Sequence, residues 1–378
     1  KGFIYVRMEY PLAVQNATLA LQQAREYGLL GENILGTGFD FDVSIHRGAG
    51  SFVSGESTAL MNALEGWVGE PRPKYVHTSQ KGLWGRPSAL NNVETFANVP
   101  LIIEHGAKWF NSIGTERSKG TKIFSLVGKV NNTGLVEVPM GMTLADIIYK
   151  IGGGIPGNKK LKGVQTGGPS GGIIPARYLN TPVDFDELTS LGSMMGSGSI
   201  IVIDEDTCAV DLARYFVDFL CSESCGKCLP CREGLKRMRE ILDAIESGRG
   251  TETDIQTLQE IAELMRTASL CALGRTAVNP VLSTIRYFRE EYDAHIKDKR
   301  CPALSCKSLV SYSIDPEICI GCDLCRENCP QGAIYKDDGG FAVVDQSKCM
   351  RCGICFEICP KKVRAVVRES KGLPGGKR

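Results

Sequence analysis

The hydrophobic pattern near the start of the chain mixes strand and helix. The segment FIYVRME at 3–9 is typical of a strand, and residues from Pro11 to Tyr27 show helical spacing. Gly28 ends this helix, because glycine readily takes the left-handed conformation that often follows a helix C-terminus. Helical stretches and Gly- or Pro-rich connections continue to about residue 118. Residues 1–118 are therefore predicted to form a mixed α/β domain.

At about residue 119 the pattern changes to short strands. Apolar or alternating runs at 121–130, 135–140 and 199–204 predict three of them. A helix is expected near Thr143–Lys150, and glycines are frequent at 152–154 and 166–172. We interpret residues 119–204 as a small α+β module of the β-grasp type.

Residues 205–300 carry long helical patterns. Helices are predicted over Asp206–Leu220 and Thr276–His295, with two more between them. Apolar residues lie on one face of each inner helix, at Leu235, Met238, Ile241, Leu242 and Ile245 in one and at Leu258, Ile261, Met265 and Ala268 in the other. Four helices of this length predict a bundle.

Length and charge limit the classes of protein that fit. A chain of 378 residues is long enough for two to four domains. Its 44 basic and 43 acidic residues give a net charge of +1, which argues against nucleic acid as a partner. Uninterrupted apolar runs stay below about 18 residues, so no membrane span is expected. The chain begins on a strand without an initiator Met or a signal-like segment, so we expect an N-terminal part of the protein to be missing.

Cysteine usage indicates metal chemistry. All sixteen cysteines lie between Cys208 and Cys359, and many are separated by only two residues. A secreted disulfide scaffold would be smaller and would spread its cysteines along the chain. Clustered cysteines in a large chain without a secretion signal indicate metal ligands in a reducing compartment, so a cytoplasmic location is expected.

The strongest motif is an internal repeat: CIGCDLCRENCP at 319–330 recurs as CMRCGICFEICP at 349–360. Each copy has the C-x2-C-x2-C-x3-C-P spacing of two-cluster bacterial ferredoxins, in which the fourth cysteine binds the other cluster. We therefore expect one 4Fe–4S cluster on Cys319, Cys322, Cys325 and Cys359, and a second on Cys349, Cys352, Cys355 and Cys329. Zinc is disfavoured, because this doubled spacing would be an unusual way to bind two zinc ions. The predicted ferredoxin domain spans 317–368, and 369–378 is a flexible tail.

A third cysteine group precedes the inner helices of the bundle. Cys225, Cys228 and Cys231 are spaced to bind three corners of another 4Fe–4S cluster. The fourth ligand must come from elsewhere, and we favour Cys271 because a bundle brings helix ends together. Cys221 is the local competitor. Lys227 and Arg232 are expected near this cluster, where positive charge would raise its potential.

The segment 301–316 is predicted to link the bundle to the ferredoxin domain. His295, Cys301 and Cys306 lie within twelve residues of one another there, enough for three of the four ligands of a zinc hinge. The alternative is two ordinary thiols at a linker, because the spacing is not a standard zinc one. Cys208 is interpreted as a buried helix residue.

Four motifs occur in one order along the chain: HRGAGSFVSGESTALMNALEG, GLWGRPSALNNVETFANVP, TGGPSGG and SCGKCLPCREG. From residue 1 to about 300 the chain resembles the C-terminal two-thirds of the NADH-oxidising flavoprotein subunit of respiratory complex I. With its added ferredoxin module it is most similar to the beta subunit of electron-bifurcating, NADH- and ferredoxin-dependent iron-only hydrogenases. The resemblance implies a multidomain α+β fold: a partial FMN/NADH-binding domain, an SLBB-like β-grasp domain, a cluster-bearing bundle and a ferredoxin domain.

The resemblance also implies an FMN site that includes Gly55, Glu56, Ser57, Asn91, Asn92 and Thr95. Without the family, each of these residues is equally well a turn residue or a helix cap. Two departures matter. The family has a second acidic residue where this chain has Ser57, and its upstream Gly-rich flavin-phosphate loop is absent here. The FMN site of this chain is therefore expected to be half a site.

By the same resemblance, electrons pass from NADH through FMN to three 4Fe–4S clusters, with no catalytic side chain required. A thioredoxin-like 2Fe–2S subunit, a larger hydrogenase-like catalytic subunit and ferredoxin are the implied partners. Three alternatives stay open. The chain is a diaphorase subunit of an NAD-dependent formate dehydrogenase, a subunit of an NADP/ferredoxin oxidoreductase, or an iron–sulfur subunit without flavin.

Overall fold

The computed structural model describes residues 1–73 and 75–370. Their contacts form two compact units. The first contains residues 1–100, 222–232 and 269–275, and the second contains the rest. The segments that carry Cys225 and Cys271 therefore belong to the first unit, although the sequence places them among the helices of a bundle. Among the described residues, no helix is both long and apolar enough to cross a membrane.

The first unit is built on a parallel pair of strands. β1 (Gly2–Val6) pairs with β2 (Val43–Arg47), with Gly2 opposite Val43. The predicted helix between them is α1 (Pro11–Glu26), and Gly28 follows it with a φ of 69°. Next come α2 (Ser57–Leu64) and α3, which begins at Val93 and ends at His105.

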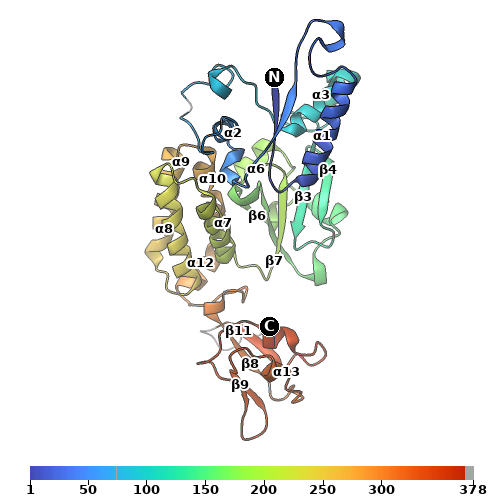
Figure 1. Ribbon diagram of the computed structural model, residues 1–378. Helices are drawn as coiled ribbons and strands as arrows, with labels where there is room; N and C mark the ends of the chain where they lie inside the picture. The colour runs from blue at the N-terminus through green and yellow to red at the C-terminus, as the bar shows by residue number, and fades with distance from the viewer. Residues whose placement is uncertain (74, 371–378) are drawn as a thin grey trace. The chain divides into compact units, whose positions relative to one another are not determined.

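The second unit contains a five-stranded sheet in the order β4-β3-β7-β5-β6 (Figure 1). The predicted strands are β3 (Thr121–Gly128), β4 (Gly134–Pro139) and β7 (Ser199–Asp204). The sequence analysis missed β5 (Leu161–Thr166) and β6 (Ile173–Pro175). Both are short and lie beside the Gly-rich turn at 167–172, which hides a strand pattern. β3 and β7 are parallel, and the other pairs are antiparallel.

A buried core fills one face of this sheet. Phe124, Leu126 and Val164 point into it from the strands. The predicted helix at Thr143–Lys150 contributes Leu144 and Ile147, but only α5 (Leu144–Asp146) is α-helical, and a π-helical turn continues over Ile147–Ile151. Two further short helices in this region are α4 (Ala107–Asn111) and α6 (Phe185–Ser190).

Helices follow the sheet, and the two inner ones match the predicted pattern. The long helices are α7 (Ala209–Glu223), α8 (Leu229–Glu246) and α9 (Glu252–Ala268). The shorter helices are α10 (Ala272–Thr276), α11 (Asn279–Tyr287) and α12 (Arg289–Ile296). The single helix predicted over Thr276–His295 is thus wrong. The chain turns at Phe288 (φ −133°, ψ 37°), whose buried ring packs with Ile173 and Ile203 of the sheet.

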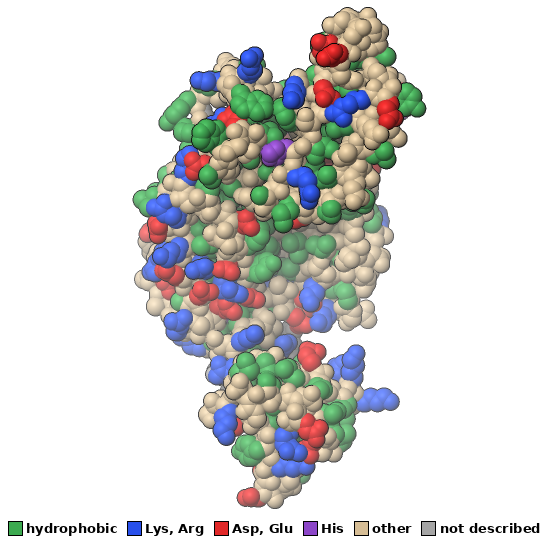
Figure 2. All heavy atoms as spheres, viewed as in Figure 1, with side chains coloured by type: hydrophobic (Ala, Val, Ile, Leu, Met, Phe, Trp, Pro, Cys, Tyr) green, Lys and Arg blue, Asp and Glu red, His purple; other side chains and the backbone are tan. Residues whose placement is uncertain are grey.

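On the face shown in Figure 2, acidic and basic side chains are interspersed on the surface of these helices. Ion pairs account for part of this mixing, for example Arg237 with Glu240 and Arg239 with Asp218. On this face, charges of the two signs are therefore mixed over the helices.

The C-terminal part of the second unit is a small module with two strand pairs. β8 (Val310–Ile314) pairs with β11 (Val366–Ser370), and β9 (Ile334–Lys336) pairs with β10 (Ala342–Val344). β8 begins inside the segment predicted as a linker, and β11 includes the first two residues of the predicted tail. Residues 371–378 of that tail lie outside the described residues.

Candidate cofactor and metal sites

The C-terminal repeat forms two cavities, and each is lined by cysteines from both copies. Cys319, Cys322 and Cys325 share one cavity with Cys359, which has about 370 Å³ of unfilled space. The lining of the other, of about 340 Å³, includes Cys349, Cys352, Cys355 and Cys329. The similar volumes suit two groups of the same kind, and the donor sets are the crossed ones that the spacing predicts.

The repeat extends to the backbone. Gly321 and Arg351, thirty residues apart, both have a positive φ, of 67° and 57°. Two residues later, Asp323 and Gly353 also have a positive φ, of 61° and 80°. They precede the short helices α13 (Leu324–Glu327) and α14 (Ile354–Ile358). Each loop therefore turns its first three cysteines inward with the same sequence of left-handed positions.

The first unit contains a third cysteine cavity. It has about 270 Å³ of unfilled space, and its lining includes Cys225, Cys228, Cys231 and Cys271. The last two are buried, at 5% and 7% exposure. Cys271 thus lines the same cavity as the three spaced cysteines although forty residues separate it from Cys231. The donor set and the volume fit the same kind of group as the two ferredoxin cavities.

Polar groups surround this third cavity. The Ser224 hydroxyl lies 3.4 Å from the Cys231 sulfur, and the buried Ser269 hydroxyl has no hydrogen-bond partner among the described residues. The Arg232 guanidinium donates a hydrogen bond of 2.6 Å to the Gly226 carbonyl, which stabilises the turn between Cys225 and Cys228. Lys227 forms an ion pair with Glu70 at 2.6 Å, so its charge is compensated at this site.

Burial controls the protonation of the cysteines when no metal is bound. It raises the pKa of Cys231 to about 11 and that of Cys355 to about 12. Unfolded thiols ionise near pH 8.5, so below that pH these thiols are neutral in both states. Above it the unfolded state releases protons and the folded state does not, and stability falls as the pH rises toward 11–12.

We therefore expect the metal-free chain to lose thermal stability between about pH 8.5 and pH 11, as followed by circular dichroism. The metal-loaded chain should not lose stability in this window, because its thiols are already bound as thiolates. Equal alkaline losses for the two forms would contradict this assignment.

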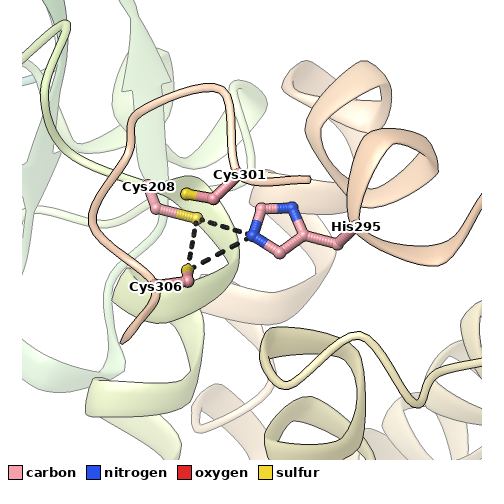
Figure 3. A group of neighbouring side chains, drawn as sticks. All are labelled: Cys208, His295, Cys301 and Cys306. Atoms are coloured by element: carbon pink, nitrogen blue, oxygen red, sulfur yellow. Dashed lines mark hydrogen bonds between the residues drawn. The ribbon is translucent and has the colours of Figure 1, made fainter. Parts of the chain in front are cut away.

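A fourth group of ligands lies in the second unit and is shown in Figure 3. The sulfurs of Cys208, Cys301 and Cys306 and the ring of His295 present donor atoms within 4.8 Å of one another. All four residues are buried, with exposures of 0–1%. The His295 Nε2 atom lies 3.5 Å from the Cys208 sulfur and 3.3 Å from that of Cys306.

The sequence analysis grouped His295, Cys301 and Cys306 but interpreted Cys208 as a helix residue. Cys208 immediately precedes α7 and points at the other three donors (Figure 3). Burial raises the pKa of the Cys208 thiol, whereas hydrogen bonds from Cys208 and Cys306 lower the pKa of Cys301. Three sulfurs and one imidazole, arranged within one sphere, match the donor set of a four-coordinate structural metal site.

The residues implied for FMN lie in two places in the first unit. Gly55, Glu56 and Ser57 form the turn into α2, where the Glu56 carboxylate accepts hydrogen bonds from the backbone of Thr58 at 2.9 Å and of Ala59 at 3.2 Å. Glu56 is therefore the N-cap of α2. The second place is the start of α3, where Asn91, Asn92 and Thr95 are all exposed.

A further opening in the first unit is lined in part by Cys225. It has about 1260 Å³ of unfilled space, and its lining includes Tyr5, His46, Gly50 and Trp67. The rings of Tyr5 and His46 stack with their centroids 5.4 Å apart. This opening was not predicted from the sequence, because its walls come from β1, β2, α2 and several separate turns, which share no common spacing. None of the six residues implied for FMN lines it.

Four family models match parts of the chain. The Nuo51 FMN-binding domain matches residues 1–101, and the SLBB domain matches 123–174. The iron–sulfur binding region of NADH-ubiquinone oxidoreductase-F matches 211–295, and a 4Fe-4S dicluster domain matches 311–360. The predicted order of a flavin domain, an SLBB-like domain, a helical cluster region and a ferredoxin domain is thereby confirmed.

Similar proteins are redox subunits. The NADP-reducing hydrogenase subunit HndC of Solidesulfovibrio fructosivorans is 52% identical over 87% of this chain and 67% of its own. The NADH-quinone oxidoreductase-F of Escherichia coli is 40% identical over 79% of this chain and 67% of its own. A NAD+-reducing [NiFe]-hydrogenase structure matches 78% of this chain with a TM-score of 0.70 and 32% identity. The chain covers about half, 49%, of that solved chain. By these similarities the chain belongs to the NADH-quinone oxidoreductase-F family, which includes a hydrogenase subunit.

Proposed function

We propose that the chain passes electrons between a bound flavin, reduced by NADH, and 4Fe–4S clusters in a multisubunit, hydrogenase-type oxidoreductase. The cavity that brings Cys271 together with Cys225, Cys228 and Cys231 carries this proposal. It supplies four thiolate donors in the unit that matches the FMN-binding model. A cluster at this position would take electrons near the flavin, without a catalytic side chain.

In this proposal the protein binds, positions and tunes its cofactors. FMN, when bound, accepts a hydride and releases single electrons, and the clusters carry those electrons onward. The resemblance would place the flavin at the turn into α2, where the Glu56 carboxylate caps the helix and holds the amides of Thr58 and Ala59. Ser57 removes the second acidic group of the family motif, which makes this turn less negative.

The crossed sets in the C-terminal module support two further clusters, for a total of three. That module would connect the chain to ferredoxin or to another subunit. The thioredoxin-like 2Fe–2S subunit and the larger catalytic subunit are proposed as partners because HndC is named as a hydrogenase subunit. Electron bifurcation and a location in the cytoplasm are part of the same proposal.

The test is to purify the chain without oxygen and to measure iron, labile sulfide and flavin. About twelve irons and twelve sulfides per chain, with NADH-dependent reduction of a viologen dye after addition of FMN, are expected. The same iron content without any flavin binding would favour the flavin-free electron-transfer subunit. Iron below about four per chain after reconstitution would contradict the proposal.

The second proposal is a structural zinc ion on Cys208, His295, Cys301 and Cys306. Three cysteines and one histidine form a closed set for tetrahedral zinc, and full burial leaves no room for substrate. The alternative of two ordinary thiols at a linker does not account for four buried donor groups converging on one point. The metal would fix the 301–306 segment to the start of α7.

We expect about one zinc per chain after reconstitution, and its loss when Cys208 is replaced by serine. The reason is that three remaining ligands hold structural zinc much more weakly than four. Mass spectrometry of the metal content measures this, with Cys221→Ser as the matched control because Cys221 is not part of the ligand group. A Cys208→Ser chain that retains its zinc would exclude Cys208 as a ligand.

A further inference from the structure

We propose that the buried ion pair between Lys162 and Glu291 is the positioning device of the zinc site. This inference rests on the zinc site proposed above. Neither residue contacts the ligand atoms directly. Lys162 comes from β5 of the sheet and Glu291 from α12, and their side chains are 13% and 8% exposed.

The pair holds the backbone on both sides of Cys208. The Lys162 ammonium donates to the Thr207 carbonyl, immediately before the ligand. The Glu291 carboxylate accepts a hydrogen bond of 2.9 Å from the Ala209 amide, immediately after it. Because Lys162 and Glu291 also pair with each other, the two contacts fix the peptide segment that presents the Cys208 sulfur.

The main chain of Glu291 also holds the histidine ligand, through a contact that does not involve its carboxylate. Glu291 and His295 are one helical turn apart on α12, and the His295 Nδ1 atom lies 2.7 Å from the Glu291 carbonyl. With the proton on Nδ1, that nitrogen donates to the carbonyl and the lone pair of Nε2 faces the three sulfurs. A hydrogen bond of this kind on the non-ligating nitrogen fixes the ring of a metal-binding histidine.

The ion pair adds no net charge beside the zinc site, because the Lys162 ammonium and the Glu291 carboxylate neutralise each other. A zinc ion with three thiolates and a neutral imidazole has a net charge of −1 in a buried site. The Lys162 ammonium, on the Cys208 side, is the cation of the pair, and its Nζ also lies 5.7 Å from the centroid of the Phe288 ring. The pair thus connects the SLBB sheet to the segment that presents Cys208 and to α12, the helix that carries His295.

The experiment compares the rate of zinc loss to excess EDTA in the full chain, with retained zinc measured by mass spectrometry. Glu291→Gln and Lys162→Met are each expected to release zinc about 10–100-fold faster than the unchanged chain. Arg239→Met is the control, because it breaks an ion pair to Asp218 between α8 and α7, and neither residue belongs to the ligand group. It should release zinc at the unchanged rate.

A single change could prevent folding by leaving one buried charge unpaired. The double variant Lys162→Met with Glu291→Gln removes both charges, so it tests the proposal in that case as well. It should also lose zinc faster, since Thr207 loses its donor. Wild-type release rates in Glu291→Gln or in the folded double variant would overturn the positioning role alone. An unchanged chain that binds no zinc would overturn the zinc site, and this inference with it.

Discussion

Replacing Cys271 with serine is expected to remove about a third of the iron, four of twelve atoms, and to abolish NADH-dependent dye reduction through the chain. Cys271 is one of four cysteines lining the cavity of the first unit, and the fourth ligand of a cubane has no substitute there. The loss is large because this cluster is the proposed acceptor beside the flavin. Iron analysis and the electron paramagnetic resonance spectrum of the reduced chain measure it.

Cys221 provides the matched control, because it is the other cysteine that the sequence offered as the fourth ligand. Cys221→Ser should retain all twelve irons and the activity. The reverse result, with iron lost from Cys221→Ser and retained in Cys271→Ser, would show that the cluster uses the local cysteine. It would then contradict the cavity as the ligand set.

The second large effect concerns the crossed ligands of the C-terminal module. Changing Cys319 and Cys359 together to serine should remove one cluster and leave about eight irons, because both belong to one cavity. Changing Cys349 and Cys359 together should remove both clusters and leave about four irons, because these two line different cavities.

The two double variants distinguish crossed from uncrossed ligand sets, because each removes the same number of cysteines. Ligands that did not cross would exchange the two results, with eight irons left by the second pair and four by the first. Iron and sulfide per chain, measured after identical reconstitution, separate the two cases. The third cavity serves as an internal reference because neither pair contains its residues.

Ligand residues could be predicted best from the sequence where they lie close together in it. The ferredoxin repeat carries its ligands, its turns and its symmetry within sixty residues, so both crossed cavities follow from local pattern. The helix break at Phe288 did not follow, because the residue packs against the sheet, and only tertiary contacts reveal that. The sequence also predicted that the charge of Lys227 raises the potential of a nearby cluster. It did not reveal that Glu70, 157 residues away in the chain, pairs with this charge.

Cys208 shows most clearly what local spacing cannot reveal. It lies 87 residues before His295, and no motif connects them. One signal was available: twelve of the sixteen cysteines are accounted for by three clusters, which leaves Cys208 as one of four to explain. The FMN residues were inferred from resemblance. Among them, only the turn at Gly55–Ser57 has a structural role that can be explained locally, as the cap of α2.

The first unit draws on three separate stretches of the chain, and the last of them ends at residue 275. During synthesis, a nascent polypeptide that has emerged only to residue 232 exposes three thiols of the third cavity without the fourth. Loading of that cubane must therefore await about forty further residues and the hairpin of α8 and α9 that returns Cys271. The set of Cys319, Cys322 and Cys325 would wait in the same way for Cys359, 34 residues after Cys325, whereas the other C-terminal set would be complete once its own three cysteines have emerged, because Cys329 precedes them.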